Sequence, residues 1–293
     1  MSLLDEIRAD AARIAADARF VHVVHERIAD YARSLPVEQA RAPELDPSTH
    51  YFGTPDDTLA FVLTLDAINF GSGYFPRLRK RPGMSGYFTV ASSLKDYFEA
   101  HGPLRLHGLI AADCATIFGQ SLDDPAVAEL MGLFAQALND LGHATAGGPR
   151  GLVDRAHGSA ERLVSVLTEM PFYRDVPFYK RAQLTAADLN TAGVAEFHDL
   201  DRLTIFADNL VPHVLRVDGV LRYEPELLER INREELIQSG SQEELEIRAC
   251  ALHAVEQMVG PLNAMQIDYL LWNRGRASLY KAQPRHRARS VFY

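Results

Sequence analysis

The stretch Leu203-Thr204-Ile205-Phe206-Ala207-Asp208-Asn209-Leu210-Val211-Pro212-His213-Val214-Leu215 places one carboxylate in the middle of an apolar run. Burying an unpaired carboxylate is costly, by roughly several kcal/mol, so a fold that keeps Asp208 here must either pair it or use it. Asp208 is therefore the first candidate for chemistry. The alternative is that Asp208 caps a helix or turns a loop ahead of Pro212.

A second acid lies among apolar residues near the C-terminus. Helical spacing places Asp268 on one face with three large apolar residues, Met265, Leu271 and Trp272. No acid follows Asp268, whereas basic residues continue at Arg274, Arg276, Lys281, Arg285, Arg287 and Arg289. This basic tail indicates a phosphate ligand or the partner of a buried carboxylate, with a solvated basic surface as the alternative.

Composition limits the kind of protein. A chain of 293 residues can bury a sizeable core, as one large domain or as two joined ones. Its net charge of -9 argues against a protein that coats duplex nucleic acid, because such binding neutralises phosphates with Lys and Arg. Cys114 and Cys250 are the only cysteines, too few for a disulfide framework or a four-thiolate zinc site. Without a signal-peptide core or an apolar run of the roughly 20 residues that span a membrane, we expect a soluble cytoplasmic protein.

Helix signals dominate the chain. Capping residues precede helical hydrophobic patterns at Ser2, Thr54, Ser121, Ser159 and Ser241. A further helical pattern runs from Val21 to Leu35. The pair Asp218-Gly219 between short apolar runs is a two-residue turn signal and predicts a small β-hairpin. We therefore predict a mainly α fold with a small β-hairpin, in a single domain over 1–293 whose two lobes would meet near 143–158.

Two further segments could meet a ligand. The stretch from Phe172 to Leu184 is dense in aromatic and basic residues and includes Lys180, a combination that suits a nucleobase and its phosphate. Asn69 and Phe70 stand where glycines and a proline interrupt a helical pattern. The alternatives are an ordinary surface lysine and ordinary core aromatics.

The dipeptide His198-Asp199 is a possible metal motif, because an HD dyad can ligate metal in phosphohydrolases. That function needs another His and a distal Asp on neighbouring helices, and the sequence fixes no such spacing. A metal-dependent phosphohydrolase and a non-enzymatic nucleotide-binding protein stay open as alternative functions.

Seven short blocks together resemble the queuosine salvage proteins, which hydrolyse queuosine 5'-phosphate to free the base queuine. The blocks occur in the family's order, and the resemblance extends over most of the chain. They are Leu65-Asp66-Ala67-Ile68-Asn69-Phe70, Gly86-Tyr87-Phe88, Phe172-Tyr173-Arg174-Asp175, Phe178-Tyr179-Lys180-Arg181-Ala182-Gln183, Phe206-Ala207-Asp208, Glu244-Leu245-Glu246-Ile247-Arg248 and Asp268-Tyr269-Leu270-Leu271-Trp272. The resemblance implies a helical fold similar to that of helix-hairpin-helix DNA glycosylases. It also implies an N-glycosyl hydrolase that supplies queuine to tRNA modification.

The same resemblance implies the site residues. The implied catalytic residues are Asp208, Lys180 and Asp268. As substrate-binding residues we predict His50, Asn69, Phe70, Tyr87, Phe206, Glu246, Trp272 and Asn273. We expect no metal and no other cofactor, a small-molecule substrate, and no direct binding of tRNA, duplex DNA or a membrane.

The chemistry of this reaction assigns roles to these residues. Cleaving a ribosyl C–N bond develops positive charge on the sugar, so a carboxylate such as Asp208 can stabilise it or deprotonate water. The implied base is a 7-deazaguanine without N7 and carries a secondary ammonium, so Asp268 fits either the base or its side arm. Lys180 would hold the 5'-phosphate or keep Asp208 ionised. The aromatic rings that could stack on the base are Phe206, Phe70 and Trp272.

Overall fold

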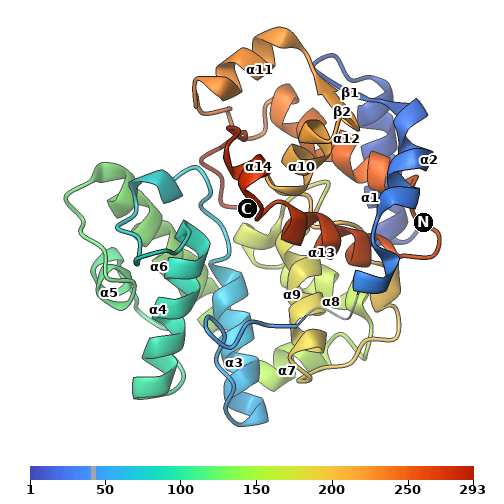
Figure 1. Cartoon of the computed structure of the whole chain (residues 1–293). Coiled ribbons are helices and arrows are strands. Elements are labelled where there is room, and N and C mark those ends of the chain that lie inside the picture. The colour runs from blue at the N-terminus through green and yellow to red at the C-terminus, as the bar shows by residue number, and fades with distance from the viewer. Residues whose placement is uncertain (41–43) are drawn as a thin grey trace. The chain divides into compact units, whose positions relative to one another are not determined.

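The computed structural model describes residues 1–40 and 44–293. Within these residues the chain forms 14 α-helices, four short 3₁₀ helices and two strands (Figure 1). The predicted mainly helical class is therefore confirmed. None of the helices in the described ranges is long and apolar enough to cross a membrane.

The chain divides into two compact units. Unit 1 comprises Met1–Pro43, Val176–Lys180 and Asp201–Arg289, and unit 2 comprises Glu44–Asp175, Arg181–Leu200 and Ser290–Tyr293. The segment 143–158, where we expected two lobes to meet, lies inside unit 2, so it does not separate the units. The prediction that 1–293 folds as a single domain stays a prediction.

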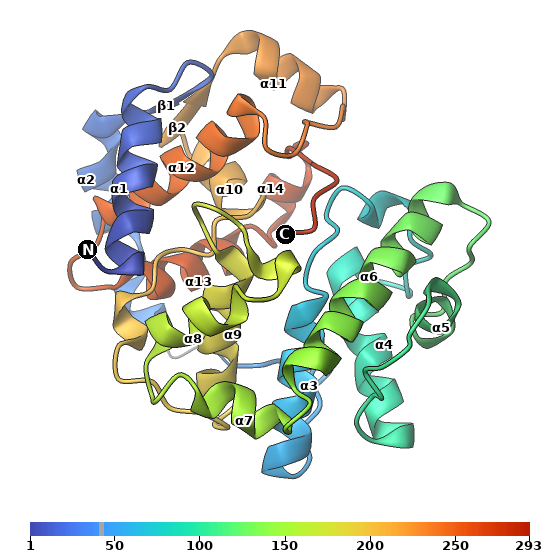
Figure 2. The same cartoon turned by 180° about the vertical axis from the view of Figure 1, so that it is seen from behind.

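Unit 1 is built around one buried helix. Its helices are α1 (Leu3–Ala16), α2 (His25–Ser34), α10 (Val211–Val217), α11 (Pro225–Asn232), α12 (Gln242–Glu256), α13 (Ala264–Arg274) and α14 (Ser278–Lys281). Helix α12 packs against α1, α10, α13 and strand β1 (Val21–Val23) (Figure 2). Because α12 is buried on almost every face, its charged residues Glu244, Glu246 and Arg248 are buried too and need partners inside the protein.

The two strands of unit 1 come from distant parts of the sequence. Strand β1 pairs antiparallel with β2 (Leu221–Tyr223), with Val21 opposite Tyr223. The predicted local hairpin at Asp218-Gly219 is wrong, because the residues before this turn form α10 and β2 takes its partner from the N-terminal region. The predicted helix from Val21 is also wrong at its start, since α2 begins only at His25. A long-range strand pairing overrides the local helical pattern here.

Unit 2 is entirely helical in the described residues. Its helices are α3 (Pro55–Ala67), α4 (Gly86–His101), α5 (Ala111–Ile117), α6 (Pro125–Ala144), α7 (Pro149–Asp154), α8 (Ala160–Leu167) and, from Arg181 onward, α9 (Lys180–Thr191). Helix α3 packs against α4, α6 and α7. The predicted caps Thr54 and Ser159 are confirmed, whereas α6 is capped by Asp124 rather than Ser121.

Candidate active site

Asp208 lies in the irregular segment that leads into α10. Its Oδ1 accepts hydrogen bonds from the backbone N–H groups of Leu210 at 2.7 Å and Val211 at 3.4 Å. Asp208 therefore caps the turn ahead of Pro212, as the alternative interpretation of the sequence expected. Within the described residues its Oδ2 accepts no hydrogen bond, and the side chain is half-buried rather than sealed in the core. The cap thus fixes the carboxylate while one oxygen stays available.

Asp268 lies on α13 and is only 5% exposed. Its Oδ2 accepts a hydrogen bond from the backbone N–H of Phe206 at 3.0 Å. Burial first, and the nearby charge of Asp208 second, raise the pKa of Asp268 to about 7, although the Phe206 N–H and the Lys180 ammonium act in the opposite direction. Asp268 is therefore an acid that exchanges its proton near neutral pH.

Lys180 belongs to the same electrostatic group, because its charge acts on the pKa of Asp268. Its side chain is buried, with 5% of the residue exposed. The residue before it, Tyr179, has a φ of +48°, a left-handed conformation that residues other than glycine rarely adopt. The structure thus brings Asp208 and Lys180 close enough to Asp268 for both charges to act on its pKa.

Three of the residues predicted to bind the ligand, Phe206, Trp272 and Asn273, belong to unit 1. Phe206 is half-buried and holds Asp268 through its backbone. Trp272 lies one helical turn after Asp268 on α13, half-buried, with the guanidinium of Arg276 5.4 Å from its ring centre. Asn273 donates a hydrogen bond to the carbonyl of Tyr269 in its own helix at 3.0 Å. Both rings are therefore partly exposed, and their contact with a ligand stays a prediction.

Glu246 occupies a different environment. Its Oε2 accepts hydrogen bonds from three successive backbone N–H groups, those of Arg19 at 3.0 Å, Phe20 at 2.6 Å and Val21 at 3.1 Å. Its Oε1 accepts one from Gln242 at 2.9 Å. The carboxylate therefore anchors the start of β1, and these four donors provide a structural reason for its burial. Its contact with a ligand stays a prediction.

Four predicted substrate-binding residues belong to unit 2. His50 is buried, with Nδ1 3.1 Å from the carbonyl oxygen of Asp46, and burial lowers its pKa. Phe70 is 1% exposed and packs against other aromatic rings, which is the core arrangement that the sequence left open. Asn69 and Tyr87 are half-buried, and desolvation raises the pKa of Tyr87. Their roles in binding also stay predictions.

The basic tail has one member near the acids. Arg274 pairs with Asp218 at 3.1 Å and Arg287 with Glu234 at 3.4 Å. Within the described residues Arg285 forms no hydrogen bond. Burial lowers the pKa of Arg285, and the charge of Asp208 partly offsets this effect. Arg285 is therefore the tail residue whose charge acts on Asp208.

Arg248 contacts the segment of Asp208, although the sequence analysis names it only within the block Glu244-Leu245-Glu246-Ile247-Arg248. It is 2% exposed, and its Nε donates to the carbonyl oxygen of Ala207, the residue before Asp208, at 2.8 Å. Its partner on α12 is Glu244, with an N–O distance of 3.3 Å. The one available signal was an opposite-charge pair spaced i, i+4 inside a helix whose other residues are apolar.

The His198-Asp199 dyad has a structural role on the Asp199 side. The carboxylate of Asp199 accepts hydrogen bonds from the Ser159 hydroxyl at 2.7 Å and the Ala160 N–H at 2.6 Å, at the start of α8, while His198 is exposed. No cluster of three or more His, Cys, Asp or Glu suited to a metal occurs in the described residues. The metal phosphohydrolase alternative is therefore not favoured.

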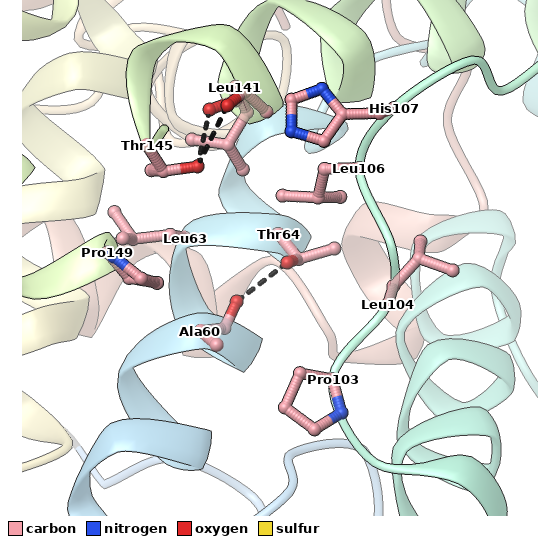
Figure 3. Close-up of a pocket in the computed structure, with 11 residues that line it drawn as sticks. Ala60, Leu63, Thr64, Pro103, Leu104, Leu106, His107, Leu141, Thr145 and Pro149 are labelled. Atoms are coloured by element: carbon pink, nitrogen blue, oxygen red, sulfur yellow. Dashed lines mark hydrogen bonds between the residues drawn. The ribbon is translucent and has the colours of Figure 1, made fainter. Parts of the chain in front are cut away.

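Unit 2 contains a cavity of about 170 Å³ between α3, the segment after α4, and α6 (Figure 3). Leucines form much of its wall, and its two threonine hydroxyls are bonded to their own helices, Thr64 to Ala60 and Thr145 to Leu141. The predicted site residues are not among the described residues that line it. This cavity is not the site implied by the sequence.

Comparison with known proteins identifies relatives over nearly the whole chain. The profile of the family described as "Queuosine salvage protein" matches residues 49–293. A queuosine 5'-phosphate N-glycosylase/hydrolase from Sphaerobacter thermophilus is 33% identical over 96% of this chain and 95% of that protein. Proteins with the same name from Dictyostelium discoideum and Mus musculus are 34% and 28% identical, over 80% and 98% of this chain and 78% and 98% of their own lengths.

Proposed function

Because the chain belongs to the queuosine salvage protein family, we propose that it hydrolyses the N-glycosidic bond of queuosine 5'-phosphate and releases queuine. Water would supply a hydroxyl group to the anomeric carbon and a proton to the departing base. The observation that best supports a catalytic site in this chain is the electrostatic group of Asp208, Asp268 and Lys180 in unit 1. For the fold, we also keep the similarity to helix-hairpin-helix DNA glycosylases as a proposal.

Asp208 would act at the sugar. As the C–N bond breaks, positive charge develops on the ribose, and a carboxylate oxygen nearby stabilises it or removes a proton from the attacking water. The Leu210 and Val211 N–H groups hold one oxygen of Asp208, which leaves the other oxygen for this task. A carboxylate fixed in this way needs little rearrangement before the reaction.

Asp268 would act at the base. A 7-deazaguanine has no N7 to accept a proton, so the enzyme must stabilise the departing base through its other polar atoms or its ammonium side arm. With a pKa raised to about 7, Asp268 can donate a proton or hydrogen bond in its neutral form and attract the ammonium in its ionised form. Phe206, whose backbone N–H binds Asp268, and Trp272, one helical turn after Asp268 on α13, would pack against the base.

The 5'-phosphate needs a positive charge near the ribose. Lys180 and Arg285 both influence the acids electrostatically, Lys180 acting on Asp268 and Arg285 interacting with Asp208. Arginine binds phosphate with two parallel hydrogen bonds, whereas lysine acts as a point charge. We therefore assign the phosphate to Arg285 and the tuning of the acids to Lys180.

The direct test is product analysis by mass spectrometry after incubation with queuosine 5'-phosphate. We expect queuine and ribose 5-phosphate from the unmodified protein. The variant Asp208→Ala should release queuine at least about 10³-fold more slowly while keeping its helical circular dichroism spectrum, because the main charge stabilisation at the sugar is lost. Full activity in this variant would remove Asp208 from the mechanism.

The same assay separates the proposed enzyme from a non-enzymatic nucleotide-binding protein. A binding protein would return queuosine 5'-phosphate unchanged at every incubation time. Release of queuine that scales with protein concentration and time supports hydrolysis. A parallel incubation with chelator should leave the rate unchanged if the reaction uses only side chains of this chain.

A further inference from the structure

One buried guanidinium in unit 1 contacts two segments that carry proposed catalytic residues. The Nε of Arg248 donates to the carbonyl oxygen of Ala207 at 2.8 Å. The Cζ of the same side chain lies 4.1 Å from the centre of the Phe178 ring. Ala207 and Phe178 are distant in sequence, so Arg248 on α12 links their segments.

The positions of these contacts are specific. Ala207 directly precedes Asp208 and directly follows Phe206, whose backbone N–H holds Asp268 at 3.0 Å. Phe178 precedes Lys180 by two residues, with only the left-handed Tyr179 between them. A shift of the Arg248 side chain would therefore move the backbone on both sides of the acid and lysine group.

Arg248 is itself held in place by Glu244. Their ion pair on α12 has an N–O distance of 3.3 Å, and the side chains are 2% and 3% exposed. The second oxygen of Glu244 accepts a hydrogen bond from the Gly240 N–H at 3.1 Å. A buried pair of this kind is a weak source of stability, because removing two charges from water costs about as much as their attraction returns. Stability alone therefore gives little reason to bury this pair.

A second arginine pair on α12 provides a comparison. Arg230 on α11 pairs with Glu243 at 3.0 Å, with side chains 30% and 20% exposed. That pair joins two helices, and within the described residues Arg230 forms no hydrogen bond with the segments of Asp208 or Lys180. Arg248 differs from Arg230 by its burial and by its bond to the backbone beside Asp208.

We propose that Arg248, held by Glu244, is a positioning residue that sets the separation of the Asp208 carboxylate and the Lys180 ammonium. This role rests on the proposed hydrolysis of queuosine 5'-phosphate. The planar guanidinium lies over the Phe178 ring and directs one N–H at the Ala207 carbonyl. A lysine at this position would keep the positive charge but lose this directed fork.

The test compares the variants Arg248→Lys, Arg248→Met and Glu244→Gln with the control Arg230→Met. Each is assayed for kcat and KM per folded molecule, with the folded fraction taken from thermal unfolding. Because a displacement of about 1 Å can cost roughly 100-fold in rate, we expect Arg248→Met to lower kcat about 100-fold with KM within about threefold. Arg248→Lys should recover part of this loss, and Arg230→Met should retain the wild-type kcat.

Two results would overturn the positioning role. One is a kcat for folded Arg248→Lys and Arg248→Met equal to that of the control. The other is a loss of activity that matches the unfolded fraction in every variant, which would make Arg248 purely structural. If Arg248→Met does not fold, Glu244→Gln and Arg248→Lys carry the comparison.

A measurement without substrate separates failure of this inference from failure of the proposed function. The Asp268 carboxyl can be titrated by carbon NMR in the wild type and in Arg248→Lys. If Arg248 positions the segment of Asp208, the variant should titrate Asp268 at a lower pH than the wild type, since the charge of Asp208 moves away. An unchanged titration counts against Arg248. A wild-type protein that releases no queuine counts only against the proposed function.

Discussion

Two of the buried carboxylates of unit 1, Glu246 and Asp268, lie in different surroundings. At the start of β1, Glu246 receives three backbone N–H groups and the amide of Gln242. On α13, Asp268 receives one backbone N–H and lies near a second acid, Asp208. The first carboxylate is satisfied by the chain, whereas the second has its pKa raised to about 7. Burial alone therefore does not distinguish the two carboxylates, whereas the number of hydrogen-bond donors around each does.

Removing the second acid should have the larger effect. We expect Asp268→Asn to lower kcat roughly 100-fold or more, because an acid that donates a proton contributes about 10² to 10⁴ in rate. In the wild type kcat should fall as pH rises through about 7, since Asp268 then loses its proton, and the variant should lack this limb. The measurement is a pH profile of kcat in both proteins, from about pH 5 to about pH 9.

The raised pKa of Asp268 also predicts how the free energy of unfolding depends on pH. The folded-state pKa of Asp268 is raised above its ordinary value of 3.8, so the folded protein holds a proton that the unfolded chain releases. The protonated Asp268 carboxyl contributes fully to the free energy of unfolding at pH values below 3.8, and this contribution declines as the pH rises to about 7. Urea unfolding of Asp268→Asn should show a flatter pH dependence in this window. An equally steep dependence in the variant would assign the effect to another group.

The satisfied acid should affect stability instead of activity. We expect Glu246→Gln to lower the free energy of unfolding by about 2 kcal/mol, because backbone N–H groups lose a charged acceptor. Its kcat per folded molecule should stay within about twofold of the wild type. The matched control is Glu256→Gln. In the wild type the Glu256 carboxylate pairs with Arg8 at 2.8 Å at a partly exposed position, so its loss should lower the free energy of unfolding by under about 1 kcal/mol. A tenfold rise in KM with unchanged stability would instead support the predicted contact of Glu246 with the ligand.

Local signals explain which parts of the fold were predictable. Ser2 and Thr54 cap their helices as expected, because capping depends on residues three positions apart. The strand at Val21 was assigned to a helix, because its partner Tyr223 lies in a distant part of the sequence. Periodicity within one segment contains no information about such a partner.

The site was predictable only in part, for a similar reason. Asp208 and Asp268 stood out because each interrupts an apolar pattern, and the structure places them within electrostatic range of each other. Glu246 was predicted to bind the substrate, yet its donors are backbone N–H groups of a distant segment, which no local pattern reveals. The sequence analysis assigned no role to Arg248, because its burial comes from the packing around α12, which no local pattern reveals.

Substituting Arg285 in the basic tail should have a smaller effect than substituting Asp208 or Asp268. We expect Arg285→Gln to raise KM for queuosine 5'-phosphate about tenfold, the loss of one charge-assisted hydrogen bond of roughly 1.5 kcal/mol. The unphosphorylated nucleoside should be affected little. Arg287→Gln is the control, because Arg287 is already paired with Glu234 at 3.4 Å. An equal rise in KM for the phosphorylated and the unphosphorylated substrate would mean that Arg285 acts on the charge of Asp208, and Lys180 would then be the residue that binds the phosphate.

The smallest effect is expected at a carboxylate that belongs to unit 2. Asp199 resembles Glu246, since its oxygens accept from the Ser159 hydroxyl and the Ala160 N–H, and these hydrogen bonds lower its pKa although burial opposes the shift. Asp199→Asn should therefore cost about 1 kcal/mol of stability, as the loss of a helix cap does, and leave kcat unchanged. Thermal unfolding and the queuine assay check both points, with Ser159→Ala as a matched variant of the same cap. The oxygens of a capping carboxylate are occupied by N–H and O–H donors, so we expect no catalytic role for Asp199. A large fall in kcat in Asp199→Asn, or sensitivity of the variant to chelator, would mean that carboxylates with satisfied hydrogen bonds also take part in the chemistry. The number of donors would then no longer distinguish Glu246 from Asp268.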